Sequence, residues 1–344
     1  MRTMDKRLSV IIPGYNTPVE WWRRSVKSVL AALGPDDEVI CVDDGSTVPL
    51  EPRQLECGDD SRVKWITLEK NCGQAEARNR GLEMAHGKYV TFVDSDDVVR
   101  SNVYQYAFEV IESSHPDVLV FGIDTFWCDI GLWRRCVPPE SIVGVLDPKK
   151  AIALQQVQLF ENPVNKIFRA AFLNEHGIRF PTDICPGEDT MFVLSCVKSG
   201  AVWGNVKYSG YVYYRVDGTT LSRYVPNMIK TLRYWNDAWQ DYKKRFPGAR
   251  EAFGDFGETT NEGMVQAEWR NMWKRASPLS FRQRFEYCVK HKDVLGRPAW
   301  FVFVKKVLYA FLRLHVYIRP IRRWHVKRLF PDVYDIAETP FPQG

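Results

Sequence analysis

The stretch KYVTFVDSDD, residues 88–97, joins a run of apolar and β-branched residues directly to three closely spaced carboxylates. A short apolar run that ends in polar residues predicts a buried strand. Asp94, Asp96 and Asp97 follow it, and like charges held close together raise one another's pKa values. The cluster therefore needs solvent, a cation or a binding partner to compensate. When the stretch is read alone, a turn or a helix cap explains the same acids equally well.

The chain on either side of this stretch alternates between strand and helix patterns. Apolar runs at 8–12, 38–42 and 63–68 predict strands. Apolar residues at helical spacing predict a helix over 19–33, and the alanine-rich segment 73–87 predicts another. This order is typical of an α/β sheet with parallel members, whose ligands bind beyond the carboxyl ends of the strands. PGYN, DDGS and DSDD each follow a predicted strand, so we expect them to line one ligand site.

The second half of the chain carries further patterns before its character changes. From about residue 224, long helical patterns rich in Trp, Tyr, Arg and Lys replace the alternation, so we expect one domain over 1–223 and a helical region over 224–344. The elements expected before that boundary are a strand at 117–123, an irregular stretch with room for a hairpin at 124–146, a helix over 147–158, a strand leading into a helix at 165–173, a helix over 188–199 and a strand at 210–216.

The composition argues against several classes of protein. Of the 344 residues, 45% are hydrophobic and 26% are charged, as in ordinary folded proteins. The net charge of +5 is too small to predict nucleic-acid binding. None of the eight cysteines forms a CxxC pair, which speaks against a zinc ribbon or a thioredoxin-type site. The apolar run 8–12 is too short for a signal-peptide core, so we expect a cytoplasmic protein with reduced thiols.

Six segments occur in an order that is typical of one enzyme family. They are SVIIPGYN, VDDGST, NCGQAEARNRGLEMAHGKYVTFVDSDD, NKIFR, GEDTMF and YYRVDGTTLS, and they cover roughly residues 8–222. In this order they resemble the family 2 glycosyltransferases. The resemblance implies an α/β protein with the GT-A nucleotide-diphospho-sugar transferase fold, a Rossmann-like mixed sheet flanked by helices, here followed by a helical C-terminal region. It also implies a donor half, about 1–100, and an acceptor half, about 101–223.

The resemblance implies an inverting, hexosyltransferase-like reaction that moves a sugar from a nucleotide diphosphate to an acceptor hydroxyl. It makes Asp189, beside Glu188, the general base. It makes Asp94 and Asp96 the DxD element that binds Mn²⁺ or Mg²⁺. Read alone, the acids of GEDTMF are better explained by the positive end of a helix dipole. The residues implied to contact the donor are Pro13, Tyr15, Asn16, Asp44, Arg78, Asn79, Asp94, Ser95, Lys166, Arg215 and Ser222.

Three other classes of protein share parts of this pattern. A sugar-nucleotide nucleotidyltransferase would carry a glycine-rich loop with a basic residue after the first strand, where this chain has PGYN. A dinucleotide-dependent oxidoreductase would carry GxGxxG there, and this motif is missing. A non-catalytic protein that binds nucleotide sugars is compatible with the sequence, although the residue types of both a metal ligand and a base are present.

The resemblance also implies the partners and the cellular setting. These are a nucleotide-diphosphate sugar, a saccharide or lipid-linked saccharide acceptor, and cell-surface polysaccharide or glycolipid synthesis, with no nucleic acid. Residues 297–330 hold nine Lys or Arg and no acid, among aromatic and apolar runs. The charges interrupt the apolar runs too often for a spanning helix. The pattern predicts either a helix lying on the inner face of the cell membrane or a helix packed on protein, including a second subunit in an oligomer.

Overall fold

The computed structural model describes residues 6–215, except positions 50, 58, 140, 147–149, 152, 155–156 and 185–186, together with scattered positions between 233 and 335. Ser222, the predicted boundary near 224, most of 297–330 and the start of the expected helix over 147–158 lie outside the described residues, so these stay predictions. Within the described part, no helix is both long enough and apolar enough to cross a membrane.

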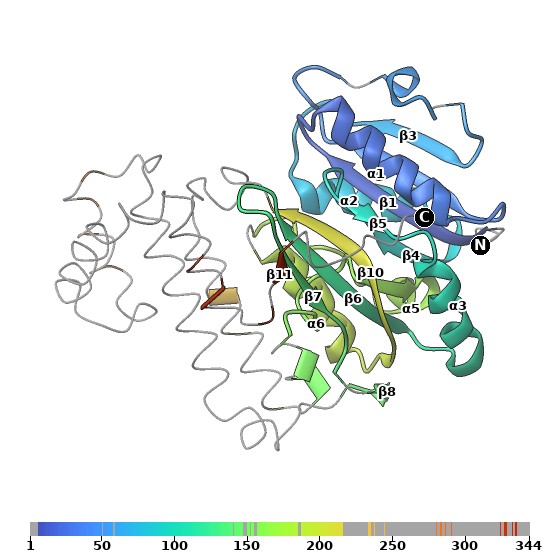
Figure 1. The fold of residues 1–344 in the computed structure, drawn as a ribbon, viewed down its shortest axis with the longest axis vertical. Coiled ribbons are helices and arrows are strands. Elements are labelled where there is room, and N and C mark those ends of the chain that lie inside the picture. Colours follow the sequence, from blue (N-terminus) through green and yellow to red (C-terminus); the bar gives the residue numbers. More distant parts are fainter. Residues whose placement is uncertain are drawn as a thin grey trace.

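The described strands form one mixed sheet (Figure 1). Its first four strands are parallel neighbours, as buried β-branched runs predict, and antiparallel pairs follow beyond them. In spatial order the strands are β3 (Val63–Thr67), β2 (Glu38–Asp43), β1 (Lys6–Gly14), β4 (Gly87–Phe92), β9 (Lys166–Arg169), β6 (Val118–Trp127), β7 (Leu132–Cys136) and β11 (Tyr334–Asp335). The long strand β10 (Val202–Arg215) pairs parallel with β6 and antiparallel with β5 (Val98–Val99) and β8 (Val143–Val145).

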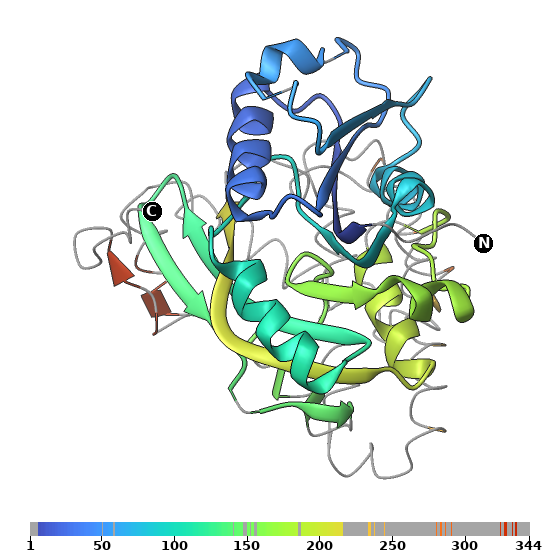
Figure 2. The same cartoon turned by 90° about the vertical axis from the view of Figure 1, so that its right-hand side faces the viewer.

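Two helices cover opposite faces of the parallel strands (Figure 2). Helix α1 (Val19–Ala32) connects β1 to β2, whereas α2 (Gln74–Met84) connects β3 to β4 in the opposite direction across the sheet. Because such crossovers are right-handed, opposite directions place the helices on opposite faces. The remaining helices are the 3₁₀ turn η1 (Pro52–Leu55), α3 (Val103–Ser114), α5 (Ala170–Glu175) and α6 (Glu188–Lys198).

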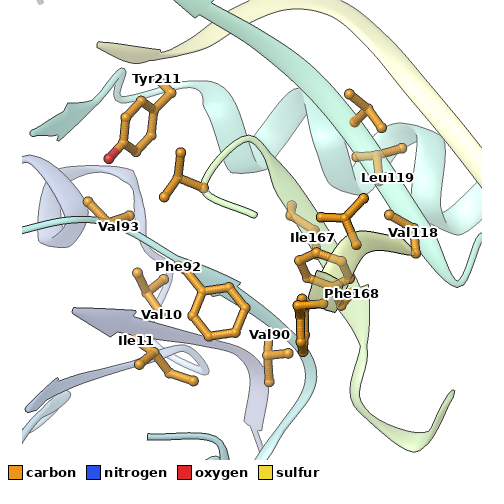
Figure 3. Packing of buried hydrophobic residues seen from close by; sticks show 14 of the residues in the cluster. Val10, Ile11, Val90, Phe92, Val93, Val118, Leu119, Ile167, Phe168 and Tyr211 are labelled. Carbon is orange, nitrogen blue, oxygen red and sulfur yellow. The ribbon is translucent and has the colours of Figure 1, made fainter. Parts of the chain in front are cut away.

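The buried core contains apolar strand residues and phenylalanine rings, several of which are labelled in Figure 3. Val10, Ile11 and Phe92 are fully buried. The ring of Phe92 lies edge-on to those of Phe168 and Phe192, with centroids 6.0 and 5.7 Å apart. Burying each such side chain contributes roughly 1.5–3 kcal/mol. This packing fixes the position of α6 relative to β4, whose following loop holds the acids of DSDD.

Apart from the helix expected over 147–158, which lies partly outside the described residues, the elements predicted up to residue 216 are present, with shifted ends. The helix expected over 73–87 ends at Met84, because Gly87 already begins β4. A Cβ at Gly87 would lie 2.5 Å from the main-chain nitrogen of Ser9, so only glycine allows β1 and β4 to approach here. The hairpin expected within 124–146 is confirmed, since β6 continues to Trp127 and pairs with β7. The strand expected at 210–216 begins earlier, at Val202.

Candidate active site

Three polar loops meet at one edge of the sheet, as the strand pattern predicts. Gly14 at the end of β1 is paired with Asp43 at the end of β2. The main-chain N–H of Asp44 donates to the carbonyl of Gly14 (2.8 Å). The N–H of Val93, just beyond β4, donates to the carbonyl of Ile11 (3.0 Å). The loops that follow β1, β2 and β4 are therefore held side by side.

Asn16 joins the loops that follow β1 and β2. Its side-chain oxygen accepts the N–H and the hydroxyl of Thr47, each at 2.9 Å, and its own N–H donates to the hydroxyl oxygen of Ser46 at 2.8 Å. Its φ of 51° is left-handed, which Asn tolerates better than most residues. Pro13 is buried in β1, whereas Tyr15 is 41% exposed. Of these candidates, Tyr15 and Asn16 lie on the open surface of the edge.

Asp44 anchors the start of α2. Its two carboxylate oxygens accept the main-chain N–H groups of Cys72 and Gly73, each at 2.8 Å. Burial raises the pKa of this carboxyl, and the two N–H donors oppose that rise. Asp44, a predicted donor contact, thus lies at the edge of the sheet. There it holds the start of α2, the helix that carries Arg78.

Asp43 is a candidate that sequence reasoning missed. Its Oδ1 accepts the N–H of Ser46 at 3.1 Å, but its Oδ2 is buried and has no hydrogen-bond partner in the described part of the chain. A buried oxygen without a donor costs free energy, so this position favours a ligand that supplies one. The adjacent acids of DDGS indicated a polar site here. The sequence does not tell which of the two carboxylates already has hydrogen-bond partners within the protein.

Arg78 links two of the predicted site acids. It lies on α2 with its side chain fully buried. One nitrogen donates to Oδ1 of Asp94 at 2.9 Å, and the other pairs with Oδ1 of Asp189. Burial disfavours the charged guanidinium, but the charges of Asp189 and Asp94 outweigh it and raise its pKa. The structure therefore brings together three candidates that lie far apart in the sequence, on α2, after β4 and on α6.

Asp189 lies in the first turn of α6, at the end of the helix that favours negative charge. Burial raises the pKa of its carboxyl, and the charge of Arg78 opposes this rise without cancelling it. Glu188 beside it is buried, with one carboxylate oxygen that has no hydrogen-bond partner among the described residues. A carboxylate whose pKa lies closer to neutrality is a better proton acceptor, so Asp189 has the chemistry of a general base.

The loop DSDD presents its acids differently. The hydroxyl of Ser95 is buried and bonds that of Thr17 at 2.8 Å, so Ser95 fixes the loop onto the loop after β1. Asp94 is engaged by Arg78 and by the side-chain amide of Gln74 (2.9 Å). The carboxylate of Asp96 makes no ion pair with any described residue, and burial, with the nearby charge of Asp94, raises its pKa to about 6. Asp96 is therefore the acid of this loop that is most open to a cation.

Two predicted donor contacts have structural partners instead. The amide of Asn79 exchanges two hydrogen bonds with the main chain of Phe180, each at 2.9 Å. Lys166 is fully buried, and its ammonium donates to the carbonyls of Leu159 and Asn162 and to the side-chain oxygen of Asn165. Three acceptors use the three N–H bonds of the ammonium, which leaves none for a phosphate. Sequence reasoning could not see this, because it depends on how the chain before β9 folds over the lysine.

Arg215 remains a candidate for contact with the donor. It is exposed at the last position of β10, and its carbonyl accepts the N–H of Cys128 at 3.1 Å.

We expect Lys166→Met to lower the melting temperature without a specific loss of nucleotide binding. The methionine preserves length but leaves the carbonyls of Leu159 and Asn162 without their donor, and each unpaired buried group costs about 1–3 kcal/mol. Thermal unfolding and calorimetry with nucleoside diphosphates test this on one sample. An unchanged melting temperature combined with a tenfold loss of affinity would instead place Lys166 against the donor.

Several proteins of similar sequence are glycosyltransferases by name. Glycosyltransferase GlyG of Streptococcus pneumoniae is 34% identical over 230 residues, which cover 63% of this chain and 74% of GlyG. An uncharacterized glycosyltransferase of Rickettsia conorii is 37% identical over 225 residues, covering 65% of this chain and 35% of that protein. The poly(ribitol-phosphate) beta-N-acetylglucosaminyltransferase TarS of Staphylococcus aureus is 29% identical over 195 residues, covering 55% of this chain and 32% of TarS. The chain thus spans about a third of the length of the last two relatives.

Solved structures share the fold. The crystal structure of S. aureus TarS 1–349 in complex with UDP-GlcNAc matches with a TM-score of 0.61 at 20% sequence identity, over 84% of this chain and 80% of that chain. This likeness, together with the mixed sheet and its flanking helices, confirms the predicted GT-A fold class. The family model described as Glycosyl transferase family 2 matches residues 9–177. The order of the motifs, the fold and the relatives agree, and the chain belongs to glycosyl transferase family 2.

Proposed function

We propose that this chain is an inverting, hexosyltransferase-like enzyme that moves a sugar from a nucleotide-diphosphate donor to a hydroxyl of a saccharide or lipid-linked saccharide in cell-surface polysaccharide or glycolipid synthesis. The observation that carries this proposal is the buried guanidinium of Arg78, which joins a carboxylate of the DxD loop, Asp94, to the candidate base, Asp189. The names of the relatives support it, since TarS acts on poly(ribitol-phosphate) and is known in complex with UDP-GlcNAc.

In the proposed reaction, Asp189 accepts the proton of the acceptor hydroxyl while that oxygen attacks the anomeric carbon. A sugar hydroxyl is a poor nucleophile, and a positioned base accelerates its attack by about 10²–10⁴-fold. Attack from the face opposite the departing diphosphate inverts the anomeric centre and needs no covalent intermediate on the protein. Glu188, in the same turn of α6, is less suited to be the base, because its side chain is buried.

The donor would lie across the loops at the sheet edge. Tyr15, Asn16 and the free oxygen of Asp43 supply a ring, an amide and an acceptor for the nucleoside. Arg78 and Arg215 supply positive charge for the diphosphate, which gains negative charge as it departs. The guanidinium of Arg78 is buried between two carboxylates, so in this proposal it acts on the diphosphate through its charge and through Asp94 rather than by direct contact.

Asp94 and Asp96 are the residues that would hold Mn²⁺ or Mg²⁺. The raised pKa of Asp96, about 6, and the absence of an ion pair between its carboxylate and any described residue fit a cation ligand. No group of three or more His, Cys, Asp or Glu among the described residues is arranged to hold a metal by itself. This agrees with Mg²⁺ sites that use one or two carboxylates together with substrate phosphates. When bound, such a cation supplies positive charge to the leaving diphosphate.

We expect Asp96→Ala to weaken binding of a nucleoside diphosphate more than binding of the nucleoside. The removed carboxylate would hold the cation that the diphosphate shares, whereas the nucleoside contacts come from other loops. Calorimetry with UDP, GDP and dTDP, each with MnCl₂ or with EDTA, and with the matching nucleosides, tests both the donor class and the metal. Equal diphosphate affinity in MnCl₂ and in EDTA for the wild-type chain would refute the metal, and no binding of any diphosphate would refute the donor class.

A further inference from the structure

Asp97, the third acid of DSDD, faces away from the sheet edge at which the loops after β1, β2 and β4 meet. Asp97 is 1% exposed, and both of its carboxylate oxygens are engaged by β10. Its Oδ2 accepts the hydroxyl of Tyr211 at 2.6 Å, and its Oδ1 accepts the main-chain N–H of Tyr214 at 2.8 Å. Both oxygens of Asp97 are therefore engaged by β10, and the residue ties the loop after β4 to that strand.

Tyr211 contacts both ends of this loop. Its hydroxyl oxygen accepts the main-chain N–H of Asp94 at 3.2 Å while the hydroxyl donates to Asp97. The loop is itself closed by a hydrogen bond from the N–H of Asp97 to the carbonyl of Asp94 at 3.1 Å. In Figure 3 the hydroxyl of Tyr211 points toward Val93, the residue just before the loop. One buried phenol thus spans the turn on which the DxD acids lie.

Helix α1 holds the same turn from another side. The side chain of Arg24 donates to the carbonyl of Asp96, and its guanidinium lies over the ring of Tyr214, 3.9 Å from the centroid. The hydroxyl of Ser25 donates to the carbonyl of Asp94 at 3.1 Å. All three of these interactions use main-chain carbonyls or a ring, so none of them occupies the carboxylate of Asp94 or Asp96.

We infer that Asp97 and Tyr211 are positioning residues for the donor site. Together they form a clamp, which holds the turn over 94–97 so that Asp94 and Asp96 present their carboxylates at the distance and direction that a shared cation needs. This inference rests on the proposed function of the same site. It explains why the chain carries three clustered carboxylates, since two face the ligand and the third fixes the turn. Outer groups that orient metal ligands commonly change metal affinity by about 10–100-fold when they are removed.

The test compares two buried tyrosines, one on β10 and one on α3, the helix that packs against β10. Tyr211→Phe removes the hydroxyl of the clamp. Tyr104→Phe, on α3, is the matched control, because Tyr104 is also fully buried but its hydroxyl has no hydrogen-bond partner in the described part of the chain. Asp97→Asn is a second variant of the clamp that keeps the shape of the side chain and one acceptor oxygen. All are made in the full chain.

The first measurement is the gain in affinity for UDP, GDP or dTDP when EDTA is replaced by MnCl₂. We expect Tyr211→Phe to reduce this gain by about 10-fold or more, with affinity in EDTA unchanged, and Asp97→Asn to act in the same direction. Tyr104→Phe should match the wild-type chain. A merely structural role for Tyr211 would lower affinity in both conditions alike, and that result, or a full gain in Tyr211→Phe, would overturn the inference.

The second measurement is amide hydrogen exchange over 93–100 in the ligand-free chain. We expect faster exchange there in Tyr211→Phe than in Tyr104→Phe, because the N–H of Asp94 loses its acceptor. Equal exchange in the two variants would overturn the clamp whatever the nucleotide results. Failure of the proposed function can be told apart from failure of the clamp. It would appear already in the wild-type chain, as no binding of any nucleoside diphosphate or as no gain in affinity from MnCl₂.

Discussion

Asp189→Asn is expected to remove nearly all sugar transfer while leaving donor binding nearly intact. The asparagine keeps the size of the side chain and an oxygen for Arg78, but its amide cannot accept the proton of the acceptor hydroxyl. The expected loss is about 10²–10⁴-fold in rate, the range that a positioned general base contributes. Calorimetry with the nucleoside diphosphate and a transfer assay on the same sample separate binding from chemistry.

Glu188→Gln is the comparison for this variant. It changes the neighbouring acid in the same turn of α6 but leaves the carboxylate of Asp189 in place, so the loss of rate should be far smaller. Transfer at the wild-type rate by Asp189→Asn would remove Asp189 from the mechanism. An equal loss of transfer rate in both variants would indicate that the combined negative charge of Glu188 and Asp189 supports transfer, rather than proton acceptance by Asp189.

The pH dependence of transfer follows from the same group. Burial raises the pKa of Asp189, and below that pKa the carboxyl is protonated and cannot act as a base. The rate in the wild-type chain should therefore fall as the pH drops through this pKa, with the fall beginning at a higher pH than for an ordinary aspartate. This acid limb should be absent from the residual rate of Asp189→Asn.

Arg78→Ala is expected to destabilise the fold as well as to remove activity. The change leaves the carboxylates of Asp94 and Asp189 close together and partly buried, without the cation between them. Removing one partner of a buried ion pair costs about 3–5 kcal/mol, and the partial exposure of both acids favours the lower end of that range. Urea unfolding measures the free energy, and calorimetry measures the loss of diphosphate binding.

Arg80→Ala is the matched control for Arg78→Ala. Arg80 lies on the same helix, but it is half exposed, and among the described residues its ion pairs are with Glu76 and Glu83. Exposed ion pairs contribute little, so this variant should unfold close to the wild-type chain. Arg78→Lys should recover part of the stability but not all of it, because an ammonium cannot reach both acids as the planar guanidinium does. Equal stability of Arg78→Ala and Arg80→Ala would contradict the linking role of Arg78.

The sequence predicted the strands that end at the site because their apolar runs are continuous and local. The runs at 8–12, 38–42 and 88–93 became β1, β2 and β4, and their parallel order places the polar loops together. The early start of β10 was missed because its register with β6 shifts between Asn205 and Tyr211, which hides the simple alternation.

Roles that depend on distant partners could not be predicted in the same way. Arg78 was implied only as a donor contact, and the sequence does not show that it is buried against Asp189, which is 111 positions away. Asp97 looked equivalent to Asp94 and Asp96, but its partner Tyr211 lies 114 positions further along the chain. Lys166 looked like a phosphate ligand by resemblance, and only the folded chain shows that its ammonium is already saturated.

Incubation of the full chain with a panel of nucleotide-diphosphate sugars, Mn²⁺ and no acceptor is the most direct test of a sugar-transferring enzyme. Water can take the place of the acceptor slowly, so the predicted result is release of a nucleoside diphosphate and free sugar from at least one donor. Formation of a nucleotide sugar from a sugar phosphate and a nucleoside triphosphate, with release of pyrophosphate, would contradict glycosyl transfer and indicate a nucleotidyltransferase.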